Sequence, residues 1–460
     1  MTPTYELILG NSLDALAMMP AESVDSIVTD PPYELAFMGK DWDASGIAFD
    51  PRIWRACLRV LKPGGHLLAF SGSRTYHRMA CAIEDAGFEL RDQIMWLYGS
   101  GFPKSLNVAK AIESGGGRPE DIRRMAMGED YAPSGRGRAN YDHGAASAMN
   151  GTAGDWEPAT DAACQWQGWG TALKPAHEPI CVARKPLVGT VAANVLTHGT
   201  GALNIDACRV EFQGDADQAS AKPQGRTTSK NTSSGNGAAA PDAGRECDRV
   251  EFESVQGSGR WPANVIHDGS DEVLAAFPDA PGQIARAKND GQASGNQVFG
   301  ALRNVTARPE ARIELDQSAA RFFYCAKASR ADRNDGVGGS DAPAVETNAT
   351  MRDREDADWP ARNGNHHPTV KPTELMAYLC RLVMPPGGVM LDPFMGSGST
   401  GKAAMREGIA FIGVELRPDY FEIAHARIAH EYACIRAAEE QASREREESS
   451  RQIDLFAGMP

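Results

Sequence analysis

Apolar and polar positions alternate along the first part of the chain in short segments that predict strands and helices in turn. Apolar runs typical of buried strands lie at residues 5–9, 24–28, 66–70 and 90–98. Apolar residues at helical spacing lie at residues 13–19, 49–61 and 76–86. Ser12 is expected to cap the first helix, and the Lys-Pro-Gly-Gly run at 62–65 is expected to end the second. Strands and helices that alternate at this spacing predict a parallel, doubly wound α/β sheet.

The same alternation returns at Lys371, after a long stretch without it. Thr373 is expected to cap the first helix of this second stretch. The expected strands lie at residues 389–391 and 410–414, and the expected helices at 374–384, from a glycine-rich turn to about 407, and at 418–432. The second stretch therefore predicts another part of an α/β sheet.

Between the two stretches the sequence is irregular. Residues 114–165 are rich in Gly, Ser, Ala and Asp, and residues 214–244 are poor in apolar side chains. A strand is expected at 179–183, and packed patches are expected at 261–267 and 322–326. The chain is divided into a first α/β half (1–104), a loop-rich insertion (105–165), a return to the sheet (166–186), a separate inserted region (187–365), a second α/β half (366–432) and a charged tail (433–460).

Composition and charge narrow the class of protein. The 460 residues exceed one ordinary domain, and 42% hydrophobic residues are enough for a substantial core. The net charge of -14 argues against a general nucleic-acid binder, although phosphate contacts need only a local basic face. Basic residues of the first insertion, interpreted as a solvated loop in preference to DNA contacts, are Arg118, Arg123, Arg124, Arg136 and Arg138. The dense Glu and Arg run over 436–451 predicts a solvated helix.

Cysteine usage and hydropathy indicate a reduced, cytoplasmic protein. The nine cysteines form no C-x-x-C pair, so neither a zinc site nor a disulfide framework is expected. The N-terminus lacks the basic and apolar regions of a signal peptide, and no run approaches the ~18 apolar residues of a membrane span. We therefore expect no metal and no membrane partner.

The first candidate for chemistry is the run Thr29-Asp30-Pro31-Pro32-Tyr33. It follows the strand expected at 24–28, and Pro31 and Pro32 cannot continue a strand, so the run would lie at the carboxyl edge of the sheet. Asp30 and the rigidly held carbonyl of Pro31 can each accept one hydrogen of an NH2 group, and Tyr33 can stack on a planar ring. The alternative is a strand-ending turn with an exposed acid.

The second candidate is the run Asp392-Pro393-Phe394-Met395-Gly396-Ser397-Gly398-Ser399-Thr400. Strand, glycine turn, helix, strand and acid is a nucleotide-binding pattern, in which Glu415 would hold ribose hydroxyls. The run from Gly396 to Lys402 also fits the G-x-x-x-x-G-K phosphate loop, but Ala403 replaces the Ser or Thr that binds magnesium, and Asp392 would repel a triphosphate. The spacing differs from the G-x-G-x-x-G of nicotinamide binders, and a packing loop with a coincidental acid is the remaining alternative.

Together the two runs resemble the signatures of the amino-methylating DNA methyltransferases, which modify the exocyclic nitrogen of adenine (N6) or cytosine (N4). Catalytic run first and cofactor run last is the order of their β class. The His-Pro-Thr-Val-Lys-Pro segment at 367–372 is similar to that class's extra cofactor-binding segment. Residues 37–43 and 168–175 resemble stretches common in phage-derived members. The wider resemblance covers residues 5–104, 166–186 and 366–430.

The resemblance implies an S-adenosylmethionine-dependent methyltransferase with a Rossmann-like sheet in permuted order. Asp30 and the Pro31 carbonyl would bind the target NH2 group, and Tyr33 would stack on the base. Direct in-line transfer needs neither a metal nor a covalent intermediate. Because a base inside a duplex cannot reach such a site, the enzyme is expected to flip the base out.

The residues implied to bind S-adenosylmethionine are Asn11, Thr369, Lys371, Asp392, Pro393, Phe394, Gly396, Gly398, Thr400 and Glu415. Among them, Asp392 and the glycine turn would hold the methionine part and Glu415 the ribose. Phe394 would pack against the cofactor, and Thr369 and Lys371 would lie near its carboxylate.

One departure from the family pattern and three alternative functions accompany the resemblance. Asn11 stands where family members often have Asp, near the cofactor adenine, which affects one contact and not the reaction. Adenine N6 is the favoured target because the catalytic run begins with Asp30, whereas Ser is commoner there in cytosine-N4 members. Cytosine N4 is the main alternative, ahead of a catalytically inactive DNA-binding protein and a phosphate-loop NTPase.

The expected partner is double-stranded DNA, read mainly by residues 187–363. Homodimers are common in the resembled family. The sequence carries no nuclease signature, which leaves a separate restriction enzyme, as in a restriction–modification pair, as a further partner.

Overall fold

The computed structural model describes residues 3–35, 41–101, 105–113, 157–212, 217, 259–278, 318–326, 330–338 and 364–457. Two compact units are present, Met1–Leu97 with Glu178–Pro460, and Tyr98–His177. The five insertion arginines from Arg118 to Arg138 lie outside the described residues, as do residues 36–40 and most of 214–244.

A nine-stranded sheet organises the first unit. Its strands are β1 (Tyr5–Leu9), β2 (Val24–Thr29), β3 (Leu61–Phe70), β4 (Glu89–Leu97), β5 (His177–Arg184), β6 (Val265–His267), β7 (Tyr324–Cys325), β8 (Val389–Asp392) and β9 (Ala410–Glu415). Their order in space is β1-β9-β8-β2-β3-β5-β4-β6-β7. The pairs β1–β9, β9–β8, β8–β2, β2–β3, β4–β6 and β6–β7 are parallel, and β3–β5 is antiparallel. The α/β expectation is confirmed, with an antiparallel strand inside the sheet.

The order of the strands along the chain differs from their order in space. N-terminal β1 pairs with β9, with Leu9 opposite Glu415, and β2 lies between β3 and β8. From β8 the chain goes to β9 on one side, and from β2 it goes to β3 on the other, so the strand order reverses between β8 and β2. Ligands of open α/β sheets bind outside the carboxyl ends of the strands at such a switch point. Both candidate runs follow the strands at this point.

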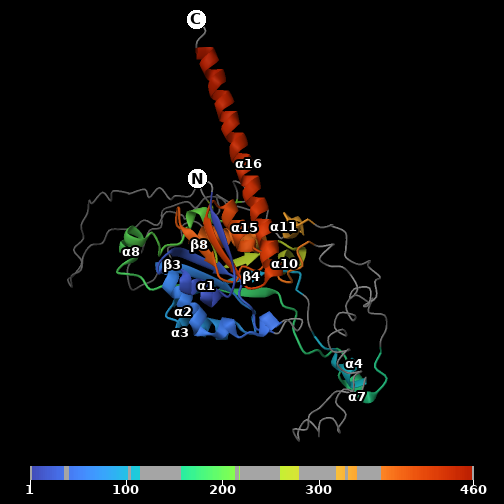
Figure 1. The fold of residues 1–460 in the computed structure, drawn as a ribbon. Helices are drawn as coiled ribbons and strands as arrows, with labels where there is room; N and C mark the ends of the chain where they lie inside the picture. Colours follow the sequence, from blue (N-terminus) through green and yellow to red (C-terminus); the bar gives the residue numbers. More distant parts are fainter. Residues whose placement is uncertain are drawn as a thin grey trace, which may run out of the picture. The chain divides into compact units, whose positions relative to one another are not determined.

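Helices cover both faces of the sheet. The helices are α1 (Ser12–Met18), α2 (Pro51–Val60), α3 (Tyr76–Asp85), α4 (Val108–Glu113), α7 (Asp161–Gln165), α8 (Val191–His198), α10 (Asp271–Ala276), α11 (Arg330–Asn334), α14 (Thr373–Val383), α15 (Ser399–Arg406) and α16 (Pro418–Ala457). Short 3-10 turns lie at Asp41–Ala44, Ile47–Phe49, Asp206–Cys208 and Ala319–Phe322. Figure 1 shows α1, α2 and α3 gathered on one face of the sheet, with α15 and α16 on the other. Helix α14 packs against α15.

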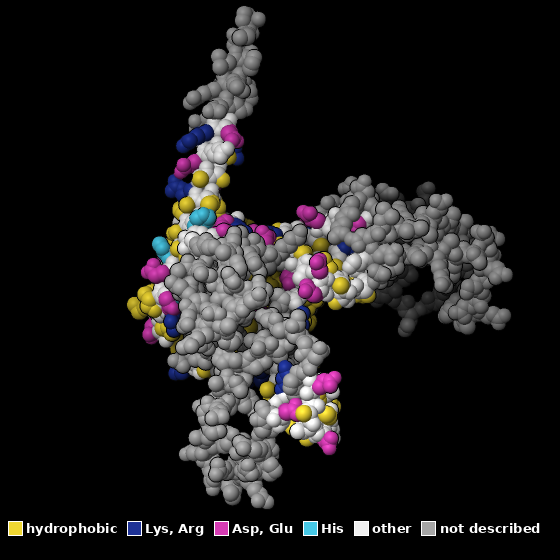
Figure 2. Space-filling model, turned by 90° about the vertical axis from the view of Figure 1, so that its right-hand side faces the viewer, with side chains coloured by type: hydrophobic (Ala, Val, Ile, Leu, Met, Phe, Trp, Pro, Cys, Tyr) yellow, Lys and Arg dark blue, Asp and Glu magenta, His cyan; other side chains and the backbone are white. Residues whose placement is uncertain are grey.

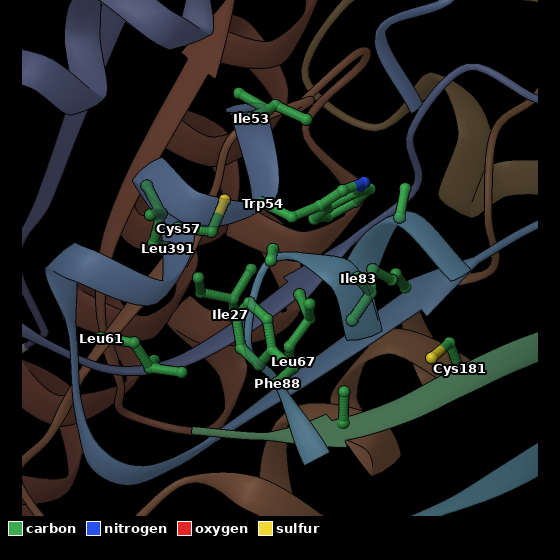
Figure 3. Packing of buried hydrophobic residues seen from close by; sticks show 14 of the residues in the cluster. Ile27, Ile53, Trp54, Cys57, Leu61, Leu67, Ile83, Phe88, Cys181 and Leu391 are labelled. Carbon is green, nitrogen blue, oxygen red and sulfur yellow. The ribbon is translucent and has the colours of Figure 1, made fainter. Parts of the chain in front are cut away.

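The main core lies between the sheet and α1, α2 and α3. Ile27 of β2, Leu67 of β3 and Trp54 of α2 are each fully buried in it and interleave in Figure 3. The Trp54 indole N–H donates to the Ala48 carbonyl at 3.0 Å, so its polar atom is satisfied. Strand β2 is buried along its whole length, as expected for a central strand covered on both faces.

Two helix caps differ from the sequence prediction. Asn11, and not Ser12, caps α1 by accepting from the Leu13 amide at 2.8 Å. The Ser12 hydroxyl instead donates to the Pro393 carbonyl at 2.6 Å. Thr373 does not cap α14, since its hydroxyl donates to Asp332 at 2.7 Å. Both side chains make contacts with residues distant in sequence, which local cap rules do not anticipate.

Strand β3 begins at Leu61, directly after α2, and runs through the Pro-Gly-Gly that was expected to separate helix and strand. The Gly64 amide donates to the Lys185 carbonyl at 3.2 Å, and the Lys185 amide donates to the Gly65 carbonyl at 2.9 Å. A Cβ on Gly65 would lie 2.7 Å from the Asp25 carbonyl oxygen, so this close strand approach requires glycine.

Helix α16 is longer than expected, continuing past Tyr432 to Ala457. Acidic and basic side chains interleave along its exposed part (Figure 2). Arg436 pairs with Glu440 at 3.2 Å, an i,i+4 contact that stabilises a solvated helix. The solvated helix predicted from the Glu and Arg run is therefore the continuation of α16.

The two insertions also differ from expectation. In the second unit α4 packs against α7, and Asn107 bridges to Gly170. The strand expected at 179–183 is confirmed as β5, which begins two residues earlier, at His177. The described strands of the region 187–365, β6 and β7, extend the main sheet beside β4 and do not form a separate one. The patches expected to be packed are confirmed in part, because Ile266 and Ala326 are fully buried, whereas Trp261 is 66% exposed.

Candidate active site

A hydrogen-bonded pair of side chains joins the two candidate runs. The Thr29 hydroxyl, at the end of β2, donates to Asp392 Oδ1 at 2.6 Å, at the end of β8. The Thr400 hydroxyl donates to Asp392 Oδ2 at 2.6 Å, and the Phe394 amide donates to Oδ1 at 3.0 Å. Burial raises the pKa of Asp392 to about 6, and the two threonine hydroxyls act in the opposite direction. Asp392 thus links the end of β2, before the first candidate run, to the glycine turn after β8, and its contact with a cofactor stays a prediction.

Asp30 presents two different carboxylate oxygens. Its Oδ2 accepts from Lys371 Nζ at 2.7 Å, whereas its Oδ1 is buried and has no hydrogen-bond partner. Burial raises the pKa of Asp30 above its ordinary range, while the Lys371 ammonium acts to lower it. A buried acceptor without a partner is costly, so Oδ1 is suited to a donor brought by a ligand.

Tyr33 is held by an acid from a different strand. Its hydroxyl donates to Glu178 Oε2 at 2.8 Å, and Lys371 Nζ lies 3.3 Å from the same oxygen. The ammonium also lies 5.2 Å from the centre of the Tyr33 ring and 5.0 Å from that of Phe70. Burial raises the pKa of Tyr33 well above its usual range, so the hydroxyl stays a donor.

The structure brings Lys371 to Asp30, a contact that the sequence did not predict. Burial acts to lower the pKa of Lys371, but Asp30 and Glu178 outweigh it and raise the pKa above its ordinary value. Thr369, from the same segment, donates its amide to His367 Nδ1 at 3.3 Å. Burial lowers the pKa of His367 to about 3, so the ring stays neutral and able to accept.

The glycine turn has the backbone that the pattern requires. Gly396 and Gly398 have φ of 54° and 79°, in the left-handed region that favours glycine. Glu415 accepts from the Gly396 amide at 2.8 Å through Oε2 and from the Arg417 amide at 2.8 Å through Oε1. Burial raises the pKa of Glu415 to about 7. The acid at the end of β9 therefore fixes the turn that follows β8.

Apolar side chains surround this part of the sheet edge. Leu9, which pairs with Glu415 across β1 and β9, is 49% exposed, and Leu416, the residue directly after Glu415, is 59% exposed. Phe394 packs on the core beside Trp54, with ring centres 6.4 Å apart. These exposed leucines were not predicted from the sequence. The feature that could have indicated them is an apolar residue beside the acid at a strand end.

Lys402 has no role in phosphate binding. Its side chain is fully buried, with Nζ 2.8 Å from both Asp332 Oδ1 and Asp335 Oδ2. An ammonium held by two carboxylates on α11 and just after it is not available to a nucleotide, which argues against the phosphate-loop interpretation.

Glu178 and Phe70 are site residues that sequence reasoning missed. Glu178 comes immediately before the strand expected at 179–183, and an acid in that position was the available signal. Across the described ranges, no group of three or more His, Cys, Asp and Glu side chains could hold a metal ion. No helix among the described residues is both long and apolar enough to cross a membrane. The cysteines within these ranges are all free thiols.

Fold and site define an α/β protein in which an acidic, aromatic turn lies beside a nucleotide-type glycine turn at one switch point. The chain belongs to the N6_N4_Mtase family of DNA methylases, whose family model matches residues 24–426. S-adenosylmethionine is the cofactor of this family.

Short stretches of the chain are also similar to curated proteins. Over 65 residues the chain is 38% identical to the type II methyltransferase M.ScaI of Streptomyces caespitosus, covering 14% of this chain and 21% of that protein. Over 71 residues it is 39% identical to YubD of Escherichia coli K12, covering 15% and 31%. The chain thus matches about a fifth to a third of the length of these curated relatives.

Among solved structures, the M1.HpyAVI–SAM complex is 13% identical with a TM-score of 0.33, covering 92% of this chain and 99% of that one. The PvuII cytosine-N4-specific DNA methyltransferase is 13% identical with a TM-score of 0.37, covering 94% and 93%.

Proposed function

We propose that this protein transfers a methyl group from S-adenosylmethionine to the exocyclic N6 of adenine in duplex DNA. The observation that carries the proposal is Asp30 Oδ1, a buried acceptor without a partner on the turn after β2. The hydrogen bond from Thr29 to Asp392 holds that turn beside the glycine turn after β8. Family membership supports methyl transfer as the reaction.

An aromatic NH2 group must become a better nucleophile before it can accept a methyl group. Its lone pair is delocalised into the ring, so it is a poor nucleophile. Asp30 Oδ1 and the Pro31 carbonyl, by accepting one hydrogen each, favour a tetrahedral nitrogen with a localised lone pair. Bound S-adenosylmethionine supplies the methyl group, and the protein contributes positioning and stabilises the positive charge that develops on the nitrogen.

The substrate base must leave the duplex to reach Asp30. Tyr33 offers a ring face for the flipped base, since aromatic side chains stack on unpaired bases. Unstacking costs a few kcal/mol, and the hydrogen bonds to Asp30 and Pro31 and the stacking contact offset this cost.

The residues around the glycine turn fit the cofactor. Gly396 and Gly398 allow the left-handed backbone of the turn, in which the Gly396 amide donates to Glu415 and the Gly398 amide to the Met395 carbonyl. Each Glu415 oxygen accepts one backbone N–H and keeps capacity for a ribose hydroxyl. Leu9 and Leu416 offer apolar surface to the adenine ring. The proposed contacts of Asn11, Thr369, Lys371, Pro393, Phe394 and Thr400 with the cofactor rest on the motif alone. In the structure the Lys371 ammonium lies on Asp30 and Glu178.

Identification of the modified base tests the proposal. The gene is expressed in a host without DNA methylation, and the DNA is digested to nucleosides and sequenced for modified bases. We expect N6-methyladenine within one recognition sequence. DNA from cells that express the Asp30→Ala variant is the negative control. N4-methylcytosine without N6-methyladenine would overturn the choice of base, and the absence of any methylated base would overturn methyl transfer.

Double-stranded DNA is the proposed partner, and the region 187–365 is proposed to read its sequence. A homodimer and a cognate restriction enzyme stay predictions, which sedimentation velocity and the nuclease content of the neighbouring genes would test.

A further inference from the structure

Three charged side chains from three distant segments meet around the proposed target amino group. Asp30 comes from the turn after β2, Glu178 from the start of β5, and Lys371 from the segment before α14. Lys371 Nζ lies 2.7 Å from Asp30 Oδ2 and 3.3 Å from Glu178 Oε2. The Lys371 side chain is 5% exposed and the two acids are each 18% exposed. A triad so buried is not a chance surface ion pair.

The antiparallel direction of β5 explains how Glu178 reaches this place. Because β5 runs against β3, its first residues lie at the edge where β2 and β3 have their carboxyl ends. The Ser71 amide donates to the Pro179 carbonyl at 3.0 Å, which fixes the start of β5 to the end of β3. Glu178 therefore stands on a rigid strand at the ligand edge of the sheet.

We propose that Glu178 is a positioning residue of the methyl-transfer site, which acts through Tyr33 and Lys371. This inference rests on the proposed function. By accepting from the Tyr33 hydroxyl, Glu178 fixes the ring that stacks on the base. By holding Lys371 on Asp30 Oδ2, it leaves Asp30 Oδ1 as the oxygen that faces the target amino group.

Charge gives Glu178 a second effect on the same reaction. Asp30 and Lys371 alone form a neutral pair, and the Glu178 carboxylate makes the triad net negative. In the transfer, the nitrogen lone pair would form the bond to the methyl carbon while the sulfur–carbon bond breaks with its electron pair left on sulfur. The nitrogen, then positively charged, would give one proton to water. A net negative triad beside the nitrogen stabilises this developing charge.

Replacing the charge while keeping the shape tests the role. In Glu178→Gln, we expect kcat to fall about 10²-fold, the size typical of one lost electrostatic contact in an active site. Affinity for S-adenosylmethionine, measured by titration calorimetry, and the melting temperature are expected to stay near wild type. Glu178→Asp is expected to recover part of the rate. Glu84→Gln, on the exposed face of α3, is the matched control with wild-type kcat.

The pH profile separates positioning from a structural role. The titratable groups that face Asp30 are Lys371, Glu178 and Tyr33, with Asp392 on the neighbouring strand. The Glu178 charge raises the pKa of Asp30 and Lys371 lowers it. If transfer needs ionised Asp30, the acid limb of kcat moves to lower pH in Glu178→Gln and to higher pH in Lys371→Met. Opposite shifts in two variants are not expected from a general loss of packing.

Labelled methyl incorporated into total DNA is the readout, whichever base accepts it. Wild-type activity with an unchanged kcat and acid limb in Glu178→Gln would overturn the inference and leave the proposed function standing. Equal losses in kcat, cofactor affinity and melting temperature would also overturn it, because they indicate a structural residue. No transfer by the wild-type protein to any duplex would overturn the function and the inference together.

Discussion

Asp30 illustrates how one side chain can serve both the protein and a substrate. Its Oδ2 is tied to Lys371, and its Oδ1 is left without a partner although it is buried. A protein that only needed stability would satisfy both oxygens, since an unpaired buried acceptor costs about 1–3 kcal/mol. The arrangement keeps a preorganised acceptor at the carboxyl end of β2.

Removing this acceptor tests its role directly. We expect Asp30→Ala to bind S-adenosylmethionine near normally, because the glycine turn and Glu415 do not depend on the Asp30 side chain. Turnover is expected to fall by about 10²-fold or more, because one of two acceptors for the amino group is lost. Titration calorimetry and labelled methyl transfer measure the two properties. Wild-type turnover in this variant would refute the acceptor mechanism.

A side chain at Gly398 is expected to have the opposite effect from Asp30→Ala, because it should affect S-adenosylmethionine binding first. Gly398 has φ of 79°, and a Cβ there would lie 2.9 Å from the Ala424 Cα. We expect Gly398→Val to distort the turn and weaken S-adenosylmethionine binding by tenfold or more, on the order of 1.4 kcal/mol. Gly408→Val is the matched control, since Gly408 has φ of 70° but no atom near its Cβ position. Equal cofactor affinity in both variants would mean that the turn tolerates a side chain.

Strands β2 and β8 form the element on which both motifs depend. Ile27 pairs with Leu391 in parallel register, and the Thr29 hydroxyl donates to Asp392 just beyond. Residues 363 positions apart in sequence are thereby held within one hydrogen bond. The pairing of β2 with β8 thus sets the relative position of the two candidate runs.

Loss of the hydrogen bond from Thr29 to Asp392 is expected to lower the stability of the protein. In Thr29→Val the shape is similar but a buried carboxylate loses a donor, so we expect the free energy of unfolding to fall by about 1–3 kcal/mol. The pKa of Asp392 is expected to rise further, because the Thr29 hydroxyl acts to lower it. Urea denaturation measures the stability, with exposed Thr197→Val, on α8, as the control. An unchanged stability would show that the Thr400 hydroxyl and the Phe394 amide are sufficient to hold Asp392.

Local patterns in the sequence predicted the strands that bear the motifs because burial and glycine turns leave signals a few residues long. The run ending in Tyr33 and the run containing Gly398 were each located in this way, and the structure places both at one switch point. The hydrogen bond from Lys371 to Asp30 was not predictable, because it depends on where a segment 341 residues away packs against the sheet. Glu178 was missed for the same reason, since its position depends on the antiparallel pairing of β5.

Helix limits were less predictable than strands where distant contacts decide them. Ser12 has the composition of a cap, but its hydroxyl donates to Pro393, and Asn11 takes the cap position. Thr373 likewise bonds Asp332 on α11, a contact that ties the inserted region to the second α/β half. In the whole molecule, therefore, local rules predict which elements form, and long-range pairing decides their ends and the site that they share.

The stability of the whole molecule is expected to depend on pH through the carboxylates buried at the cofactor edge. Burial raises the pKa of Glu415 from its ordinary value of 4.5 to about 7. Folding therefore favours the protonated form, so its contribution to stability is complete below about pH 4.5 and is lost as the pH rises through about 7. The loss amounts to about 3 kcal/mol for a shift of this size. Asp392, with a pKa of about 6, adds a decline in the same direction.

Glu415→Gln removes the ionisation, and its NH2 group can no longer accept one of the two backbone N–H groups at Gly396 and Arg417. That lost hydrogen bond lowers the stability at every pH, so the slope against pH, and not the absolute stability, reports the ionisation. We expect the unfolding free energy of the variant, from urea denaturation at pH values between about 4.5 and 8, to fall less steeply than that of wild type. The difference should grow in favour of the variant as the pH rises, while affinity for S-adenosylmethionine falls because the carboxylate that would hold the ribose is gone. Parallel curves would show that Glu415 ionises in the folded protein as readily as in the unfolded chain, and that the backbone donors at Gly396 and Arg417 offset its burial.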